Sequence, residues 1–392
     1  MKIRKIACAV SGGLDSGVAA YLLKRKGYEV IGVFMRNWDV IDETGQCLAD
    51  KDSEDARYVC RVVGIPFREV NFVKQYWNGV FSEMIDEYKK GITPNPDVLC
   101  NKRIKFGIFW NYMINQLKVD AIATGHYAQT SFGEDLENYD PHKGARLLRA
   151  VDDFRDQTLF LSQIPQEALQ KSLFPVGRLM RNDVQKIASE IPLTKILKKK
   201  KSTGICFIGK RNFQKFINDY IEPSVGNFID VETGSIVGQH SGIHQWTLGQ
   251  RCLLPGCKVA YFVAEKNPAS QDILVAPGSD HPSLYCDTVI VENPYWINRV
   301  PEDLLRTKKL KCKIRTQQGY RYPLEKCQVD IIEDDKLFVK IENSQRALTP
   351  GQYAVLYLDE ECLGSGRIAQ LGPSLYDLQM NKNTELGFIS TK

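Results

Sequence analysis

Two glycines and two serines surround an aspartate near the start of the chain. The string Ser11-Gly12-Gly13-Leu14-Asp15-Ser16 follows the apolar run Ile6–Val10 and precedes apolar residues at helical spacing over 16–26. A strand that turns into a helix directs free backbone N–H groups at one point, and such a site binds phosphate. The carboxylate of Asp15 suits Mg²⁺ held against the phosphates. The alternative is an ordinary glycine turn in which Asp15 caps the helix.

A second segment, residues 91–102, combines two prolines with polar side chains and a cysteine. The prolines favour a rigid, extended connection. Asn95 and Asp97 carry an amide and a carboxylate, which suit the polar edge of a nucleobase. Cys100 stands where we expect a helix to start, with basic residues after it, and that setting favours the thiolate. From these residues alone, a structural turn with Cys100 as a small buried hydrophobe is an equally good interpretation.

A second cysteine lies in a glycine-bracketed segment. Cys206 stands between Gly204 and Gly209, after the basic run Lys198–Lys201. Glycines on both sides predict a mobile loop that presents the sulfur. The basic run could contact an RNA backbone, although such runs are equally often solvated faces. Together with the loop around Asp15 and the string Thr124–Tyr127 after a predicted strand, these residues form a specific combination.

Composition bounds the class of protein. The chain has 392 residues, of which 43% are hydrophobic and 25% charged, as expected for two or three globular domains. No apolar run approaches the roughly 20 residues that cross a bilayer. The net charge of +5 permits a nucleic-acid partner without arguing for one. Eleven cysteines without paired zinc spacing indicate a reducing compartment. We expect no leader segment, which leaves cytosol and organelle matrix open.

Short apolar runs alternate with helical stretches over the first 125 residues. Strands are predicted at 6–10, 29–34, 67–71 and 119–123, and helices at 16–26, 53–63, 75–90 and 101–117. This rhythm predicts a doubly wound parallel sheet with its site at the carboxyl ends of the strands. Residues 160–200 are predicted to be helical. Beyond about residue 225, short β-type runs predict a small linking domain and then a barrel, at 228–231, 236–237, 259–263, 273–275, 288–291, 310–314, 328–332, 337–341 and 353–357.

These motifs together resemble the tRNA-specific 2-thiouridylases over nearly the whole chain. The resemblance rests on SGGLDS, TPNPDVLCNKRIKFG, ATGHYA, RDQTLFLSQ, GICFIGKRNF, TLGQR, TPGQYAVLY and CLGSG, in that order. The strings CLADKDSEDARYVC and GKRNF are closest to the mitochondrial branch. The resemblance implies an α/β ATP pyrophosphatase (PP-loop) domain over 1–209, a central β-rich linking domain over 210–283, a C-terminal β-barrel over 284–379 and a tail over 380–392.

The resemblance also implies a reaction and its residues. ATP, with Mg²⁺, adenylates the 2-oxo group of the wobble uridine of a tRNA anticodon, and sulfur from a cysteine persulfide replaces that oxygen. Cys100 is then the nucleophile, Cys206 the persulfide carrier, and Asp15 the metal ligand. The implied ATP-binding residues are Ala9, Val10, Ser11, Gly12, Gly13, Leu14, Asp15, Ser16, Met35 and Gly125. The implied contacts to the target base are Asn95, Pro96 and Asp97, and those to the rest of the tRNA are His126, Arg155, Asp156, Gln157, Arg315, Thr316 and Gln352.

The same resemblance implies partners and a compartment. Besides tRNA, a persulfide donor or relay protein such as a cysteine desulfurase is expected, and Cys100 and Cys206 are expected to form a transient disulfide. We expect a monomer or weak dimer, no membrane partner, and the mitochondrial matrix. The chain departs from the family at Arg155, commonly Lys, and at Thr316, often Tyr. The alternatives are another PP-loop enzyme, such as a GMP synthetase or a tRNA lysidine synthase, and an inactive tRNA-binding protein.

Overall fold

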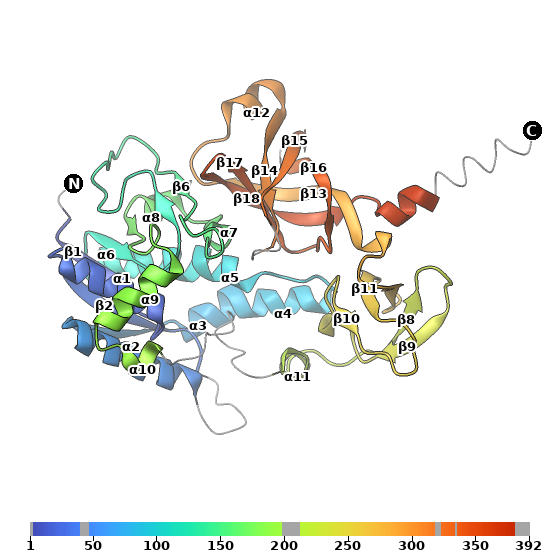
Figure 1. Ribbon diagram of the computed structural model, residues 1–392, viewed down its shortest axis with the longest axis horizontal. Helices are drawn as coiled ribbons and strands as arrows, with labels where there is room; N and C mark the ends of the chain where they lie inside the picture. The colour runs from blue at the N-terminus through green and yellow to red at the C-terminus, as the bar shows by residue number, and fades with distance from the viewer. Residues whose placement is uncertain (1–2, 40–46, 198–211, 318–322, 334, 381–392) are drawn as a thin grey trace, which may run out of the picture.

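The computed structural model describes residues 3–39, 47–197, 212–317, 323–333 and 335–380. These residues form three sheets, each at the centre of one part of the molecule. The N-terminal domain stands on the left in Figure 1, the C-terminal barrel above it, and the central domain on the right. No helix among the described residues has the length and apolar character to cross a membrane.

A five-stranded parallel sheet forms the centre of the N-terminal domain. The strand order is β3-β2-β1-β4-β7, with β1 (Lys5–Ala9), β2 (Glu29–Arg36), β3 (Phe67–Asn71), β4 (Ala121–Ala123) and β7 (Ser172–Leu173). Ile6, Ala7 and Cys8 are fully buried, as expected of a strand covered on both faces. The predicted doubly wound fold is confirmed. Strand order reverses between β1 and β4, and such a point opens a ligand crevice at the carboxyl ends.

The helices of this domain are more broken than predicted. The first two are continuous, α1 (Leu14–Arg25) and α2 (Leu48–Val63). The predicted helices at 75–90 and 101–117 each contain a π-helical segment, giving α3 (Val73–Tyr76), η1 (Trp77–Phe81) and α4 (Ser82–Lys89), then α5 (Pro96–Leu99), η2 (Cys100–Phe109) and α6 (Trp110–Asn115).

The prediction of continuing helix over 160–200 is only partly correct. The structure has short elements there, α7 (Thr158–Leu161), α8 (Gln166–Leu169), β7, α9 (Arg181–Glu190) and α10 (Thr194–Leu197). Pro165, Pro175 and Pro192 stand between them. Proline lacks the N–H that continues a helix and disfavours helical backbone in the preceding residue, so each proline separates two elements.

The central domain is a small, mostly antiparallel sheet. Its strand order is β10-β11-β12-β8-β9, with β8 (Gly226–Asp230), β9 (Ile236–His240), β10 (Arg251–Cys252), β11 (Tyr261–Lys266) and β12 (Ile273–Pro277). The helix α11 (Phe213–Asn218) and the 3₁₀ turn η3 (Ile243–Gln245) accompany it. Phe228, Val263 and Val275 form its own small core. The predicted β-rich linking domain is confirmed.

The C-terminal domain is a barrel in which β13 pairs with both β16 and β18. Its elements are η4 (Pro282–Leu284), β13 (Tyr285–Trp296), α12 (Glu302–Thr307), β14 (Lys309–Arg315), β15 (Glu325–Glu333), β16 (Lys336–Arg346), β17 (Tyr353–Leu358) and β18 (Glu361–Leu371). Strand β18 was not predicted, because its glycines are unfavourable in strands. They are needed there, since a Cβ at Gly364 would lie 2.0 Å from the Tyr295 carbonyl oxygen.

The N-terminal domain adds two short strands to the barrel sheet. These are β5 (Gln129–Thr130) and β6 (Leu147–Leu148), and β6 pairs with β18. Tyr357 of β17 is fully buried within the N-terminal core, and its hydroxyl lies 3.0 Å from Thr158 Oγ1. The barrel is therefore joined to the N-terminal domain by shared sheet and shared core, and the two can position one site together.

Candidate functional site

The loop after β1 fits only glycine at its centre. Gly12 has φ +72°, and a Cβ there would lie 2.6 Å from the Asp52 carbonyl oxygen and 2.9 Å from Asp55 Cβ. Both neighbours belong to helix α2, whose backbone cannot easily move. The turn from β1 into α1 is thus held tightly against α2 by a left-handed glycine.

The two serines of this loop bond to each other and to the loop. Ser16 Oγ accepts the Ser11 backbone N–H at 3.2 Å, and its hydroxyl donates to the Gly13 carbonyl at 3.0 Å. Gly13 is the N-cap of the twelve-residue helix α1 and supplies no side-chain cap. The first N–H groups of α1 therefore lack a side-chain cap, and together with the glycine backbone they fit a phosphate group.

The end of β4 closes on the same loop. A Cβ at Gly125 would lie 2.5 Å from the Ser16 nitrogen and 2.7 Å from the Asp15 carbonyl carbon, so the two backbones touch. Met35 is the last residue but one of the neighbouring strand β2, two residues beyond Val33, which pairs with Ala9. The structure therefore brings the predicted nucleotide residues of the loop, Met35 and Gly125 together at the strand-order reversal.

Asp15 has two partners that sequence reasoning missed. Arg181, at the start of α9, forms an ion pair with its carboxylate, and the Tyr127 hydroxyl donates to Asp15 Oδ1 at 3.0 Å. Burial, followed by the charge of Asp15, raises the pKa of Tyr127 to about 12. Tyr127 therefore remains a hydrogen-bond donor at neutral pH. Arg181 lies 166 positions from Asp15, in a segment without a motif, so no local pattern pointed to it.

The helix that carries Cys100 starts earlier than predicted. Asn95 Oδ1 accepts the Val98 backbone N–H at 3.3 Å and caps α5, whose first residue is Pro96. Cys100 lies beyond the first turn and is buried, with 4% of its surface exposed. The expectation that this thiol stands at a helix N-terminus is wrong, because Asn95 caps the helix five positions before Cys100. Dipole effects fade within the first turn.

A chain of polar groups connects the end of β4 to α5. His126 Nδ1 lies 2.8 Å from Thr124 Oγ1, and its Nε2 lies 3.4 Å from Lys105 Nζ. Burial and the charge of Lys105 hold the pKa of His126 well below its usual range, so the ring is neutral. Since an ammonium only donates, we assign Nε2 as the acceptor and place the ring proton on Nδ1.

Lys105 also acts on Asp97 of α5. Burial raises the pKa of the Asp97 carboxyl, and the nearby charge of Lys105 partly opposes that shift. Lys105 therefore lies between a carboxylate beside the predicted base contacts and a histidine beside the nucleotide loop. The nucleotide loop (residues 11–16) and the segment 91–102 are far apart in the chain, and these polar groups join them into one site.

Gln352 of the barrel contacts the loop that precedes α5. Its side-chain NH₂ donates to the carbonyl oxygens of Thr93 at 2.9 Å and Pro94 at 3.0 Å. Its Oε1 accepts from Asn95 Nδ2 at 3.1 Å. The predicted residues Asn95, Pro96, Asp97 and Gln352 are thus brought together, although they come from two domains.

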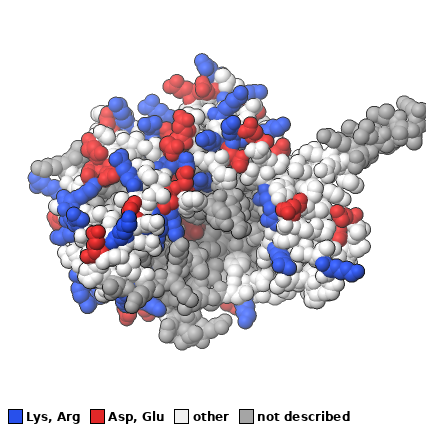
Figure 2. Space-filling model, viewed as in Figure 1, with Lys and Arg blue, Asp and Glu red and all other residues white. Residues whose placement is uncertain are grey.

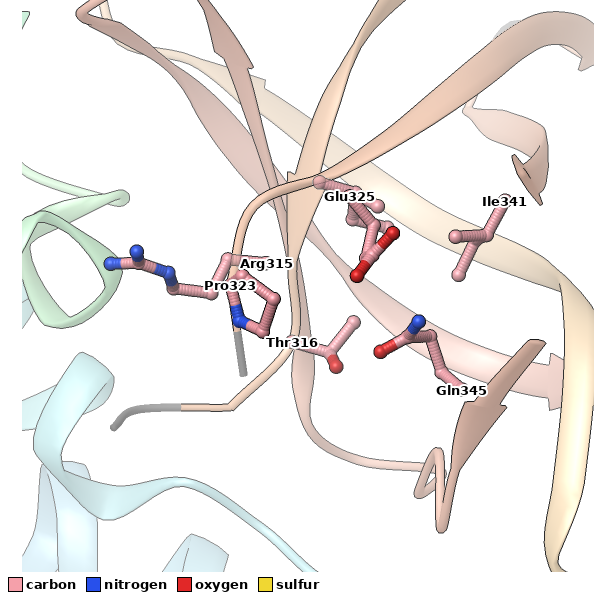
Figure 3. A pocket seen from close by; sticks show the side chains of 7 residues that line it. Arg315, Thr316, Pro323, Glu325, Ile341 and Gln345 are labelled. Atoms are coloured by element: carbon pink, nitrogen blue, oxygen red, sulfur yellow. The ribbon is translucent and has the colours of Figure 1, made fainter. Parts of the chain in front are cut away.

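The other predicted tRNA contacts are placed differently. Asp156 is fully buried and forms an ion pair of 2.9 Å with Arg315, itself 6% exposed. Burial raises the pKa of Asp156, against the hydrogen bonds and the Arg315 charge that lower it. Figure 3 shows the Arg315 side chain directed away from Glu325 and Gln345 and toward the N-terminal domain. This pair joins two domains, and in this structure neither side chain lies on the surface.

The neighbours of this pair have separate surroundings. Gln157 Oε1 accepts the Tyr127 backbone N–H at 2.9 Å, and Arg155 is partly exposed. Thr316 lines a small pocket in the barrel, with Ile314, Arg315, Pro323, Glu325, Ile341 and Gln345 (Figure 3). The tRNA contacts of these residues stay a prediction.

Cys206 and the run Lys198–Lys201 lie outside the described residues. The predicted approach of Cys206 to Cys100 therefore stays a prediction. On the face shown in Figure 2, the described Lys and Arg residues are interspersed with Asp and Glu over the N-terminal domain and the barrel. No single positive field covers this face, in agreement with the modest net charge.

The fold and the site define a class of protein: an α/β domain with a phosphate-type loop at its strand-order reversal, joined to a β-rich module and a barrel. Three family models match, described as the tRNA methyl transferase HUP domain over 4–210, the tRNA methyl transferase PRC-barrel domain over 214–277 and the aminomethyltransferase beta-barrel domain over 286–368.

Full-length relatives name the family. The chain is 46% identical to the mitochondrial tRNA-specific 2-thiouridylase 1 of Gallus gallus, covering 98% of this chain and 96% of the relative. It is 46% identical to that of Drosophila melanogaster, over 95% of each. It is 42% identical to the tRNA-specific 2-thiouridylase MnmA of Alkaliphilus oremlandii, over 94% of this chain and 98% of the relative. The chain belongs to the tRNA-specific 2-thiouridylase family, and the resemblance seen in its motifs is confirmed.

Proposed function

We propose that this chain uses ATP to replace the 2-oxo group of a wobble uridine in tRNA with sulfur, giving 2-thiouridine. The observation that carries the proposal is the junction of the two motifs. Gly125 touches the loop of Asp15, and His126 and Lys105 connect it to Asp97 on the helix of Cys100. An activated oxygen and an attacking sulfur must meet at one carbon, so the two motifs have to share one site.

ATP is the substrate that the first motif fits. The Gly12–Gly13 backbone and the start of α1 would hold its phosphates, with Met35 and Gly125 at the edges of the site. The residues Ala9, Val10, Ser11, Leu14 and Ser16 complete the predicted set. Asp15 is 36% exposed at its side chain and offers a carboxylate for Mg²⁺, which neutralises phosphate charge when bound.

The activation step exchanges one leaving group for a better one. The uridine O2 attacks the α-phosphorus of ATP, an O–P bond forms, and the bond to pyrophosphate breaks. Asn95, Pro96 and Asp97 would hold the base, and Arg181 and Tyr127 keep Asp15 in place beside the phosphates. The 2-oxo oxygen leaves later as AMP, which is a far weaker base than oxide.

Sulfur transfer needs two thiols. The outer sulfur of a Cys206 persulfide attacks C2, and AMP leaves as the C–O bond breaks. Cys100 then attacks the inner sulfur, a Cys100–Cys206 disulfide forms, and the S–S bond to the base breaks to leave the thiocarbonyl. The two electrons gained by the outer sulfur come from the two thiols. A dithiol reductant restores both thiols for the next turnover.

The remaining assignments are proposals of the same kind. Arg155, Asp156, Gln157, His126, Arg315, Thr316 and Gln352 are proposed as tRNA contacts from the family resemblance. The sulfur donor is a persulfide protein such as a cysteine desulfurase, the compartment is the mitochondrial matrix, and the chain acts as a monomer or weak dimer. Domain boundaries at 209, 283 and 379 remain our proposal.

Single substitutions test the two thiols. Purified protein, unmodified tRNA, Mg²⁺-ATP, a persulfide donor and a dithiol are incubated, and 2-thiouridine is measured by nucleoside analysis. Cys206→Ser and Cys100→Ser should each abolish 2-thiouridine while leaving ATP binding intact. Wild-type rates in Cys206→Ser would remove the carrier role, and wild-type rates in Cys100→Ser would remove the nucleophile role. Incorporation of nitrogen from added ammonia, with no 2-thiouridine formed, would favour an amidating PP-loop enzyme.

A further inference from the structure

The loop before α5 contacts all three domains. Residues 92–95, here called the base loop, connect α4 of the N-terminal domain to α5. In Figure 1 this connection passes between the barrel above it and the central domain on the right. A loop that must hold one base in one orientation gains from fixed neighbours on several sides.

The barrel fixes the backbone of the base loop. The Thr93 N–H donates to the Pro350 carbonyl at 3.2 Å, while Gln352 donates to the Thr93 and Pro94 carbonyls. Gly351, with φ +94°, permits this approach, because a Cβ there would lie 2.4 Å from Ile92 Cγ2 and 2.7 Å from the Thr93 oxygen. Every polar backbone group of Thr93 is therefore bonded to the barrel.

The central domain fixes the other side. Lys266, the last residue of β11, donates to the Trp246 carbonyl at 3.0 Å and to Thr93 Oγ1 at 3.4 Å. Burial lowers the pKa of Lys266 to about 8. Gly91, with φ +75°, lies against Ile243, since a Cβ there would be 2.8 Å from Ile243 Cδ1.

These contacts reach Cys100 through one side chain. Gln352 accepts from Asn95 Nδ2, which orients the amide so that Asn95 Oδ1 faces the Val98 N–H and caps α5. An N-cap fixes where a helix starts and how it is rotated. Asp97 and Cys100 lie on the helix that this cap starts, so the direction of both depends on Gln352.

We propose that Lys266 and Gln352 are positioning residues that hold the base loop and α5 in the orientation needed for sulfur transfer. The proposal rests on the proposed function. It assigns a role to Lys266, which no sequence motif singled out, and it gives Gln352 a positioning role as an alternative to the RNA contact that the family resemblance implies. Loss of either residue should slow the chemical step rather than weaken tRNA binding, because contacts to the RNA phosphate backbone elsewhere supply most of the affinity.

The first test separates rate from affinity. Gln352→Glu places a carboxylate against two carbonyl oxygens, and Gln352→Met keeps the shape without the bonds and without the charge. Each should lower the rate at saturating tRNA and ATP by about ten- to a hundredfold, as expected for a small misplacement. Lys266→Met should act in the same direction, and all three should keep tRNA affinity within about twofold. The matched controls are Gln370→Glu on the barrel surface and Lys258→Met on the central domain, both exposed.

The second test needs no substrate. Hydrogen exchange of the peptide over residues 91–101 in the free protein should quicken in the Gln352 and Lys266 variants and stay unchanged in the two controls. Unchanged exchange in the variants, or a loss confined to tRNA affinity at an unchanged maximal rate, would overturn the proposal. A wild-type protein that fails to thiolate tRNA would overturn the proposed function instead, and the exchange comparison would still decide whether the loop is held.

Discussion

The two halves of the site are built in different ways. The loop around Asp15 takes its shape within the N-terminal domain, because Gly12, Gly13 and Ser16 form the turn and Gly12 packs against α2. The base loop has little shape of its own and takes it from the barrel and the central domain, through Gln352 and Lys266. Nucleotide binding should therefore tolerate changes in the other domains, whereas base positioning should not.

The largest expected effect is a loss of thiolation without a loss of ATP affinity, which separates the two halves of the site. Cys100→Ser should reduce thiolation by about 10³-fold or more, since it removes a reacting atom, and should leave ATP affinity unchanged. Cys257→Ser, in the central domain, is the control and should stay within about twofold of wild type. Nucleoside analysis and equilibrium dialysis with a non-hydrolysable ATP analogue measure the two quantities. A matching loss of ATP affinity in Cys100→Ser would show that the halves are not separable.

The second prediction concerns the joint between the domains. Arg315→Met leaves Asp156 buried without its ion-pair partner and should cost about 3–5 kcal/mol of unfolding free energy. Adding Asp156→Asn should recover part of that loss, because the carboxylate that lost the Arg315 charge is then neutral. Denaturant unfolding measures both. If Arg315→Met instead keeps its stability and loses tRNA affinity, Arg315 is an RNA contact as the family resemblance implies.

A pair of glycines tests whether the nucleotide loop depends on its close packing against α2. Gly12 and Gly64 have nearly equal φ values, +72° and +73°, but a Cβ at Gly64 meets nothing within 4 Å. Both alanine variants pay for left-handed backbone, about 1 kcal/mol or more. Only Gly12→Ala also clashes with α2, and we expect it to weaken ATP affinity about a hundredfold. Equal ATP affinity in the two variants would show that ATP binding does not depend on the packing of Gly12 against α2.

Arg181 tests the contact between α9 and the nucleotide loop. Arg181→Met leaves Asp15 negative beside the phosphates, and ATP affinity should fall about tenfold. The exposed Arg178 provides the control, since Arg178→Met removes an equal charge nearby and keeps Asp15 paired. Calorimetric titration with the ATP analogue measures both. An equal loss of ATP affinity in the control would show that the effect arises from net charge alone.

The smallest expected effect concerns the pH dependence of stability. The pKa of Lys266 is about 8 in the folded protein against an ordinary 10.5, so the unfolded chain holds more protons between those pH values. Stability conferred through this group therefore rises with pH across that window. Because the side chain is partly open to solvent, we expect a rise of about 1 kcal/mol, absent in Lys266→Met. Parallel stability–pH curves for the two proteins would contradict this.

The comparison also explains what the sequence could predict. The string from Ser11 to Ser16 predicted the nucleotide loop. The alternation of apolar runs and helical stretches over the first 125 residues predicted the parallel sheet and the site at its strand ends. Local pattern also revealed most barrel strands. It missed β18 because Gly364 and Gly366 serve a close approach between strands that only tertiary structure creates.

Contacts between domains were beyond local pattern. Nothing near Lys266 or Arg181 in the chain signals Thr93 or Asp15. The family resemblance implies Asp156 and Arg315 as tRNA contacts, and only the fold shows that they form a buried ion pair. Asn95 was predicted as a base contact, yet its capping role moved the start of the Cys100 helix. Burial and long-range pairing, which no spacing rule encodes, determined the surroundings of Lys266, Arg181 and the Asp156–Arg315 pair, whereas the Asn95 cap is a local contact to Val98.

The central claim is that ATP cleavage and sulfur transfer occur at one uridine on this chain. The most direct measurement incubates the full chain with unmodified tRNA, radiolabelled ATP and a persulfide donor carrying labelled sulfur. The account predicts equal amounts of AMP, pyrophosphate and 2-thiouridine, with the label at the wobble position alone. Sulfur incorporation without ATP cleavage, or AMP release without 2-thiouridine, would contradict it.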